Sequence, residues 1–344
     1  MEQAAFRRAI KGPEARRILF DGDRPRFVLG IDDFEPDDLE ELWRRAIAIR
    51  AAVRDDPLAC RDRLPGRRVM HLFAQPSTRT CESFVAATEL LGGSARVVSD
   101  LSATSLVKGE SVADAIQVFA HVFDAVVVRH PDPDFAWQAA HGLYRGPASM
   151  VLVSAGTGAF EHPTQAMLDG LALRESLGGN LANRRVLVVS DLHRNRTARS
   201  FGTLMARFPG TRIDLVSPEA HRPDSALLDS WRARGAEVVL HDDLEATLRS
   251  DGRELDVIYM TRSQQEWDDR DDYEAPLGAD PRFVLRPEFG ELLRDDVRLM
   301  HPLPRVNELP EIWDAHPHNL IWAQVDSGRW VRAALLEWML TADG

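Results

Sequence analysis

Six short polar segments follow apolar runs in this 344-residue sequence, and most of them contain an arginine. The segments are residues 77–80, 129–131, 156–165, 191–196, 261–264 and 301–305. Each apolar run is typical of a buried strand, and open α/β sheets bind their ligands beyond the carboxyl ends of the strands. A guanidinium group is a planar set of donors that pairs with phosphate and carboxylate oxygens. The six segments therefore predict a site for a small anion.

The segment Ser77-Thr78-Arg79-Thr80 carries the clearest signal for a phosphate. The apolar run 69–73 predicts a strand, Pro76 ends it, and the apolar residues that follow have helical spacing. The segment would then lie at a helix N-terminus, where backbone N–H groups and the helix dipole favour an anion. The alternative is that Ser77 or Thr78 only caps the helix and that Arg79 is a surface residue.

Strand-like and helix-like segments alternate along most of the chain, which is typical of parallel sheets covered by helices. The length suffices for two domains with separate cores. We predict an α/β fold in which two doubly wound parallel-sheet domains are joined by interdomain helices. The predicted parts are an N-terminal extension at 1–28, a first domain at 29–161, a second domain at 162–327 and a C-terminal helix at 328–344 that packs back on the first domain.

Composition limits the kinds of partner. The chain has 42 basic and 54 acidic residues, a net charge of −12, which argues against nucleic acid and anionic membranes as partners. No apolar run approaches the roughly 20 residues of a membrane span, and the charged N-terminus is unlike a signal peptide. Cys60 and Cys81 have no metal-type spacing and cannot form a disulfide framework. We therefore expect a cytoplasmic protein with a local cationic pocket.

These segments resemble the motifs of the aspartate/ornithine carbamoyltransferase family. The three main motifs are matched in order by Ser77-Thr78-Arg79-Thr80, His162-Pro163-Thr164-Gln165 and His301-Pro302-Leu303-Pro304-Arg305, and lesser ones by Arg129-His130-Pro131, Arg196-Thr197 and Thr261-Arg262-Ser263-Gln264. The likeness covers about residues 28–340. The ornithine branch usually has His-Cys-Leu-Pro where this chain has His-Pro-Leu-Pro, which favours the aspartate branch. The resemblance implies an enzyme of pyrimidine biosynthesis that carbamoylates L-aspartate with carbamoyl phosphate and uses no metal or cofactor.

By resemblance, the first domain binds carbamoyl phosphate. Ser77, Thr78, Arg79 and Thr80 would hold the phosphate, Arg129, His162 and Thr80 would polarise the carbonyl oxygen, and Gln165 would bind the carbamoyl NH₂ group. Ser105 and Lys108 would reach the active site of the neighbouring subunit, which implies a homotrimer with shared sites. The implied catalytic residues are Arg79, Thr80, Lys108, Arg129 and His162. For His162 the alternative is a cap on the helix at 163.

The second domain would bind aspartate. Arg196, Arg262 and Gln264 would take its two carboxylates, and the carbonyls of Leu303 and Pro304 would accept from the amine and the carbamoyl NH₂ group. A salt bridge to the acidic run 266–274 is the alternative for Arg262. A different amino-acid acceptor and a non-catalytic paralogue in a complex stay open as functions, and regulatory or pathway-enzyme subunits stay open as partners.

Three residues depart from the family pattern. Gln75 and Val85 stand where the family commonly has glutamate, so the balance of domain closure would differ. Cys81 stands where the family commonly has arginine. In the first helical turn it is either a thiol of low pKa or, as we favour, a small packed residue.

Overall fold

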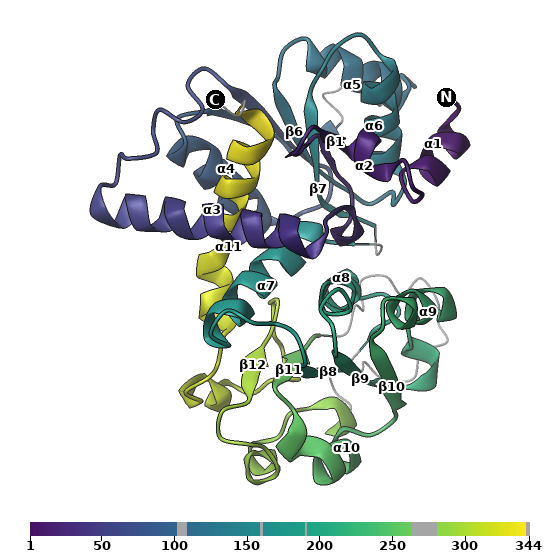
Figure 1. The fold of residues 1–344 in the computed structure, drawn as a ribbon, viewed down its shortest axis with the longest axis vertical. Helices are drawn as coiled ribbons and strands as arrows, with labels where there is room; N and C mark the ends of the chain where they lie inside the picture. The colour runs from purple at the N-terminus through teal and green to yellow at the C-terminus, as the bar shows by residue number, and fades with distance from the viewer. Residues whose placement is uncertain (102–108, 159–160, 190, 263–280, 342–344) are drawn as a thin grey trace. The chain divides into compact units, whose positions relative to one another are not determined.

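The computed structural model describes residues 1–101, 109–158, 161–189, 191–262 and 281–341. These residues form two compact units, both drawn in Figure 1. Unit 1 contains Met1–Thr164 and Gly328–Gly344, and unit 2 contains Gln165–Ser327. The chain enters unit 2 within α7 (Pro163–Ser176) and leaves it within α11 (Ile321–Leu340). Each unit contains a five-stranded parallel sheet, which confirms the predicted α/β class with two parallel-sheet domains.

The sheet of unit 1 has the strand order β3-β7-β6-β4-β5. Its strands are β3 (Phe27–Val28), β4 (Arg68–Phe73), β5 (Ser94–Val98), β6 (Ala125–His130) and β7 (Val151–Thr157). Strands β4 and β6 are apolar and buried along most of their length, as expected where both faces of a parallel sheet are covered. All four pairings are parallel, so the segments that follow β4, β6 and β7 leave the sheet at one edge.

Helices connect these strands, and apolar residues at helical spacing predict three of the four, at 38–54, after Ser77 and at 111–123. The bounds are α3 (Pro36–Asp55), α4 (Thr78–Leu90), α5 (Val112–Ala120) and α6 (Phe135–Arg145). Apolar residues at helical spacing predict one buried face for 38–54, and Leu39, Trp43 and Ile49 of α3 are indeed all buried. Helix α6 was missed, although the parallel pair β6 and β7 requires a crossover connection of this kind.

The first 28 residues pack on unit 1. Helix α1 (Gln3–Ala9) buries Phe6, whose ring lies 5.3 Å from the rings of His141 and Tyr144 on α6. After α2 (Ala15–Leu19), the strands β1 (Phe20–Asp21) and β2 (Arg24–Pro25) form an antiparallel pair. The N-terminal segment therefore covers part of α6.

The sheet of unit 2 has the strand order β10-β9-β8-β11-β12 and is also parallel throughout. Its strands are β8 (Arg185–Val189), β9 (Arg212–Val216), β10 (Glu237–His241), β11 (Val257–Met260) and β12 (Arg298–Met300). Neighbouring side chains of β11 lie on opposite faces of the sheet. Ile258 packs in one cluster with Leu244 of α10 (Leu244–Asp251). The Tyr259 ring stacks on the Phe201 ring of α8 (Arg196–Met205), with 4.1 Å between the ring centroids. Figure 1 shows α8 and α10 on opposite sides of this sheet, as in a doubly wound domain.

The remaining elements are short, apart from the end of the chain. They are α9 (Ser225–Ala233) and the 3₁₀ turns η1 (Ile31–Asp33), η4 (Glu219–His221), η5 (Gly252–Glu254), η8 (Pro281–Phe283), η9 (Pro287–Leu292) and η10 (Glu311–Ala315). Helix α11 begins seven residues before the predicted start at 328. The side chain of Asn319 accepts a hydrogen bond from the Ile321 amide at 2.9 Å and so caps the longer helix.

A buried histidine should make unit 1 sensitive to acid. His71 on β4 is fully buried, and burial lowers its pKa to about 4. Because the unfolded chain binds a proton near pH 6.5, stability is present above that pH and is lost as the pH falls toward 4. We expect the free energy of unfolding to fall by roughly 2 kcal/mol more between pH 7.5 and pH 5 than in His71→Leu, measured by urea unfolding. The exposed His121 gives the matched control, since His121→Leu should leave the pH dependence unchanged.

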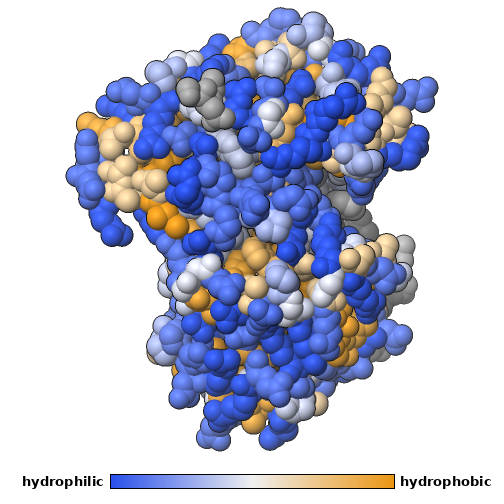
Figure 2. All heavy atoms as spheres, in the orientation of Figure 1, coloured by the Kyte–Doolittle hydropathy of each residue, from blue (hydrophilic) through white to orange (hydrophobic). Residues whose placement is uncertain are grey.

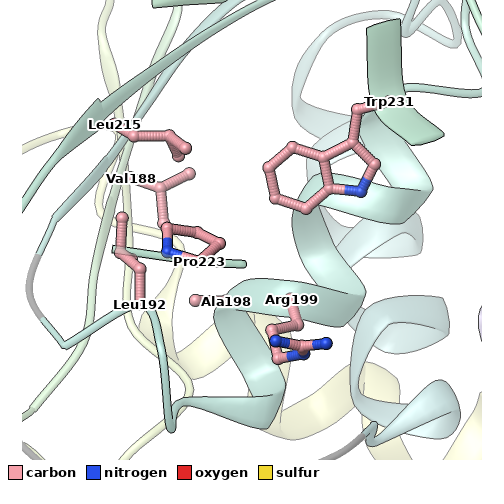
Figure 3. A pocket seen from close by; sticks show the side chains of 7 residues that line it. All are labelled: Val188, Leu192, Ala198, Arg199, Leu215, Pro223 and Trp231. Carbon is pink, nitrogen blue, oxygen red and sulfur yellow. The ribbon is translucent and has the colours of Figure 1, made fainter. Parts of the chain in front are cut away.

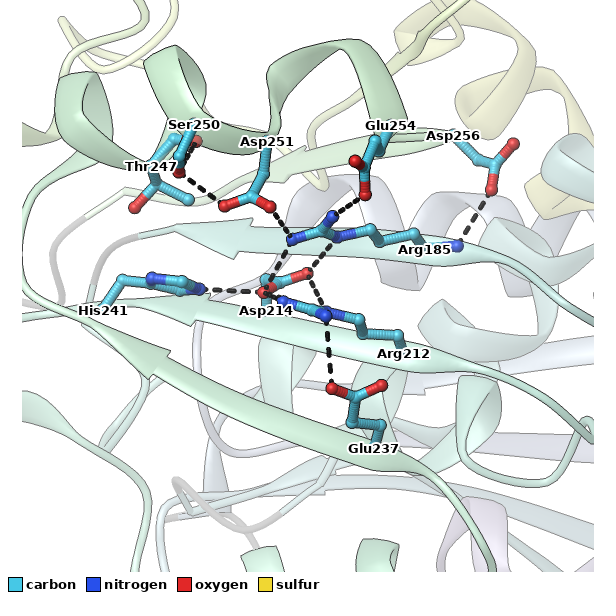
Figure 4. A network of polar contacts seen from close by, with 10 residues as sticks. All are labelled: Arg185, Arg212, Asp214, Glu237, His241, Thr247, Ser250, Asp251, Glu254 and Asp256. Atoms are coloured by element: carbon cyan, nitrogen blue, oxygen red, sulfur yellow. Dashed lines mark hydrogen bonds and ion pairs between the residues drawn. The ribbon is translucent and has the colours of Figure 1, made fainter.

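A charged network lies on the sheet of unit 2, as Figure 4 shows. The carboxylate of Asp214 is fully buried and contacts Arg185 at 2.8 Å, Arg212 at 3.2 Å and His241 at 2.8 Å. Burial opposes its ionisation, but the hydrogen bonds from these three donors outweigh burial and hold the pKa of Asp214 well below its usual value. Arg185 also contacts Asp251 at 2.8 Å, so the network connects β9 with the end of α10.

Asp214→Asn should destabilise unit 2 by about 3 kcal/mol, because removing one partner leaves buried charges uncompensated. The measurement is urea unfolding at neutral pH, followed by tryptophan fluorescence. The control is Asp242→Asn, since Asp242 pairs with Arg222 on the surface and such pairs contribute under about 1 kcal/mol. Equal losses in the two variants would contradict a structural role for the network.

The visible surface is mostly hydrophilic, with smaller hydrophobic areas, as Figure 2 shows. None of the helices in the described part of the chain is both long enough and apolar enough to cross a bilayer.

Candidate active site

One edge of the unit 1 sheet collects those predicted carbamoyl-phosphate residues of unit 1 that the structure describes. In the register of β4 and β6, Phe73 lies opposite Arg129, and the amide of Ala74 donates to the Arg129 carbonyl at 2.8 Å. In the register of β6 and β7, His130 lies opposite Thr157. The three segments that carry Ser77 to Thr80, Arg129 and His162 therefore leave neighbouring strands at the same edge.

The N-terminus of α4 carries the first motif. Ser77 is the N-cap residue, but its hydroxyl makes no capping hydrogen bond, and Thr78 already lies within the helix. Ser77 therefore occupies the N-cap position of the alternative without the side-chain hydrogen bond of a cap. Arg79 is exposed, as a group that meets a soluble ligand would be, whereas Thr80 is buried. A hydrogen bond of 2.7 Å from Arg332 to Ser83 joins α4 to the end of α11 within unit 1.

Arg129 and His162 are both buried at this edge. The Arg129 guanidinium donates to the carbonyl of Ala155 on β7 at 3.3 Å. The turn before His162 is held by Glu161, which accepts from the Ile31 amide at 2.8 Å and forms an antiparallel bridge with Thr157. A Cβ at Gly30 would lie 2.9 Å from the Glu161 carboxylate, so this close approach depends on glycine. The role of Glu161 is not evident from the sequence, since its partner is 130 residues away.

The structure decides between the two interpretations of Cys81. The side chain is 7% exposed, and burial raises the pKa of its thiol. A thiol of low pKa is therefore excluded, and the favoured reading as a small packed residue is confirmed.

An edge of the unit 2 sheet carries the two predicted acceptor arginines, Arg196 and Arg262. Arg196 begins α8 after β8, and Arg262 follows β11 two residues after its end. Asn195 connects them: its side-chain oxygen caps α8 through the amides of Thr197 and Ala198, and its nitrogen donates to the Arg262 carbonyl at 3.3 Å. Both arginines are partly exposed, so their guanidinium groups can meet a ligand.

Asp191 organises the loop before Arg196 and was not assigned a role from the sequence. It is fully buried, with Arg194 at 2.8 Å and His221 at 3.4 Å from its carboxylate. Burial opposes its ionisation, but the hydrogen bonds from His221 and Arg194 prevail and lower its pKa. Its place directly after an apolar strand was the available signal.

The segment with Leu303 and Pro304 follows β12. His301 accepts the Leu303 amide on Nδ1 at 2.9 Å and donates from Nε2 to Glu308 at 2.8 Å. Glu308 also accepts from the amides of Val306 and Asn307. It therefore contacts both the start of the segment 301–307, at His301, and its end. Burial lowers the pKa of His301, which keeps the imidazole neutral.

Gln165 lies in the first turn of α7 and is partly exposed. Its amide nitrogen donates to Asp169 at 2.8 Å. Ser105, Lys108 and Gln264 lie outside the described residues, as does the acidic run 266–274 considered as a partner of Arg262.

A small apolar hollow in unit 2 is separate from these segments. Figure 3 shows its lining: Val188, Leu192, Ala198, Arg199, Leu215, Pro223 and Trp231. Trp231 packs so closely on α8 that a Cβ at Gly202 would lie 2.4 Å from its ring. The hollow is thus a packing feature between β8, β9, α8 and α9.

Comparison with known families gives two matches that together span most of the chain. Residues 26–175 match "Aspartate/ornithine carbamoyltransferase, carbamoyl-P binding domain". Residues 182–339 match "Aspartate/ornithine carbamoyltransferase, Asp/Orn binding domain". A curated relative, the aspartate carbamoyltransferase catalytic subunit of Methanopyrus kandleri, is 36% identical over 317 residues, which are 92% of this chain and 97% of the relative.

Solved structures give the same picture. Aspartate transcarbamoylase of Trypanosoma cruzi in complex with carbamoyl phosphate matches with a TM-score of 0.83 and 29% identity, over 94% of this chain and 100% of that one. The same enzyme in complex with N-(phosphonacetyl)-L-aspartic acid has a TM-score of 0.81 and 27% identity, over 95% and 100%. The catalytic subunit of M. jannaschii aspartate transcarbamoylase has a TM-score of 0.78 and 28% identity, over 91% and 97%.

Proposed function

The chain belongs to the aspartate/ornithine carbamoyltransferase family, and we propose that it transfers the carbamoyl group of carbamoyl phosphate to L-aspartate. The products are N-carbamoyl-L-aspartate and phosphate, in pyrimidine biosynthesis. The observation that carries the proposal is the placement of Arg79, Arg129 and His162 at one edge of the unit 1 sheet, in a chain whose relatives are aspartate carbamoyltransferases. Unit 1 would bind carbamoyl phosphate and unit 2 the acceptor.

In the proposed reaction the aspartate amine attacks the carbonyl carbon, the bond from that carbon to the phosphate oxygen breaks, and the amine loses a proton. Arg79, with Ser77, Thr78 and Thr80 at the N-terminus of α4, would hold the phosphate and stabilise its charge as it leaves. Arg129 and His162 would donate to the carbonyl oxygen, where negative charge develops. Both are buried, and donors act more strongly where water is excluded.

On the acceptor side, Arg196 and Arg262 would pair with the two carboxylates of aspartate, with Gln264 as a further ligand. Their connection through Asn195 supports this, because it fixes the spacing between the two backbone segments that carry the arginines. A diamino acid such as ornithine would place a cation against these arginines, which disfavours it.

An acceptor panel tests the function. Purified protein, carbamoyl phosphate and aspartate should give carbamoyl-aspartate, measured by a colorimetric assay for carbamoylated amino acids. Ornithine and other amino acids should give less than one hundredth of that rate. Another preferred acceptor would support the alternative of a different carbamoyltransferase, and no product with any acceptor would support a non-catalytic paralogue.

Arg262→Ala should raise the KM for aspartate roughly 100-fold and leave the KM for carbamoyl phosphate unchanged, because charge-assisted pairing with a carboxylate is lost. The matched control is Arg232→Ala, which removes an arginine on α9 that pairs with Asp229. If Arg262 serves only a salt bridge within the protein, the two variants will have the same KM for aspartate.

We also propose a cytoplasmic homotrimer in which Ser105 and Lys108 complete the site of a neighbouring subunit. A compact ammonium on a flexible stem suits a phosphate held by another chain. Nucleic acid and membranes are not proposed as partners, since the net charge of −12 disfavours both.

A further inference from the structure

Asp169 is a buried carboxylate that is not among the residues proposed to contact the substrates. It lies on α7, one helical turn after Gln165, and its side chain is fully buried. One carboxylate oxygen accepts from Gln165 Nε2 at 2.8 Å and from Gln324 Nε2 at 2.7 Å. The other accepts from the Tyr259 hydroxyl at 2.7 Å. A buried carboxylate costs free energy unless hydrogen bonds satisfy it, and here three donors do so.

The bond to Gln165 fixes which end of that amide is presented to a ligand. A carboxylate only accepts hydrogen bonds, so the nitrogen of the amide must face Asp169. The amide oxygen is then the group available to the site, and Gln165 is partly exposed. A carbamoyl NH₂ group is a donor and needs an acceptor. With the amide flipped, two NH₂ groups would oppose each other.

Through the hydrogen bond to Gln324, Asp169 is connected to the segment that contains Leu303 and Pro304. Gln324 Oε1 accepts from the His301 amide at 3.0 Å, and His301 Nδ1 accepts from the Leu303 amide at 2.9 Å. Leu303 has a φ of 57°, in the left-handed region that is unfavourable for a residue with a Cβ. Such a conformation persists only where the surroundings hold it. Gln324 and His301 are 2% and 1% exposed, so the connection from Asp169 is shielded from water.

We propose that Asp169 is a positioning residue that orients the Gln165 amide toward the carbamoyl NH₂ group and, through Gln324 and His301, holds the Leu303 and Pro304 carbonyls in place. The inference rests on the proposed function, because it takes the ligand to be carbamoyl phosphate. Every residue of the chain of hydrogen bonds belongs to unit 2. Asp169 itself touches no substrate; it acts through the groups that do.

The test compares carbamoyl phosphate with acetyl phosphate, which has a methyl group in place of the NH₂. We expect the wild-type protein to bind carbamoyl phosphate about tenfold more tightly, as measured by calorimetry, since only its NH₂ group can donate hydrogen bonds. Asp169→Ala should reduce this preference to less than twofold and leave the Kd of acetyl phosphate unchanged. Asp169→Asn should keep it, because its oxygen can still accept from both glutamines and the Tyr259 hydroxyl can turn to accept.

A folded Asp169→Ala that keeps the tenfold preference would overturn the orienting role. So would an equal loss of affinity for both ligands, since that would indicate general damage to the site. Tyr259→Phe is the matched control: it removes one hydrogen bond to Asp169, leaves both glutamines in place, and should keep the preference.

Gln324→Leu tests the connection from Asp169 to the segment of Leu303 and Pro304. It also replaces Asp169→Ala as the test variant if Asp169→Ala does not fold. It should lower kcat at least tenfold with the acceptor that the panel identifies, because it releases the segment that carries the Leu303 and Pro304 carbonyls. A kcat within threefold of wild type would overturn this part of the proposal. The two-ligand comparison needs no acceptor, so a wild-type protein that fails to carbamoylate aspartate would refute the proposed function while leaving the role of Asp169 testable.

Discussion

Arg79→Ala should lower kcat/KM for carbamoyl phosphate roughly 1,000-fold, as expected when a cationic group that stabilises a leaving phosphate is removed. The proposed role needs a planar cation at the N-terminus of α4, where the helix dipole also favours the phosphate. The side chain is exposed, so its removal should create no cavity and leave the thermal unfolding midpoint within about 2 °C. The measurement is steady-state kinetics with circular dichroism on the same sample.

Two variants sharpen this result. Arg54→Ala removes another exposed arginine of unit 1, on α3, and should leave kcat/KM unchanged. Arg79→Lys should recover only part of the activity, because an ammonium group cannot reproduce bidentate pairing with phosphate. A folded Arg79→Ala with near-normal kcat/KM would remove the basis for placing the phosphate at α4.

Mixing two inactive variants, Arg79→Ala and Lys108→Ala, should restore about one quarter of wild-type activity if the protein is a homotrimer with shared sites. In a randomly mixed closed ring, half of the subunits supply an intact Arg79, and half of their relevant neighbours supply an intact Lys108. The product of the two halves is the expected fraction of complete sites. Each variant alone should be at least 100-fold less active than wild type, since each removes a cation from the proposed phosphate site.

The measurement requires dissociation, mixing and reassembly of the two variants, with native mass spectrometry to establish that mixed trimers are present. Lys11→Ala is the matched control, because it removes the other lysine of the chain, whose ammonium lies 5.5 Å from the Trp137 ring. Lys11→Ala should be fully active alone. Mixed trimers of Arg79→Ala and Lys108→Ala that stay as inactive as their parents would refute the shared site.

The sequence predicted the elements that depend on local patterns. The strand before Ser77 and the helix after it follow from an apolar run, Pro76 and helical spacing, which are properties of neighbouring residues. The missed helix α6 begins at Phe135, shortly after Pro131 and Pro133. Only the parallel pairing of β6 and β7, which are far apart in the chain, makes the crossover necessary.

The environments of Cys81, Asp169 and His301 depend on residues that are not neighbours in the sequence. Burial raises the pKa of Cys81, whereas its position in a first helical turn suggested a thiol of low pKa as one reading. Asp169 receives a hydrogen bond from Gln324, 155 residues away, and no local pattern relates the two. His301 takes the tautomer that its two partners require, and Glu308 as one of them became evident only from the folded turn.

The α/β class, the two parallel-sheet domains and the family could be predicted from the sequence, because hydrophobic periodicity and short motifs depend on residues close together in the chain. The polar side chains that support those motifs became evident only in the folded protein: Glu161 before His162, Asp191 in the loop before Arg196, and Asp169 between Gln165 and Gln324. The physical reason is that a buried polar group must find its hydrogen-bond partners wherever the fold places them, and that distance along the chain does not restrict the choice.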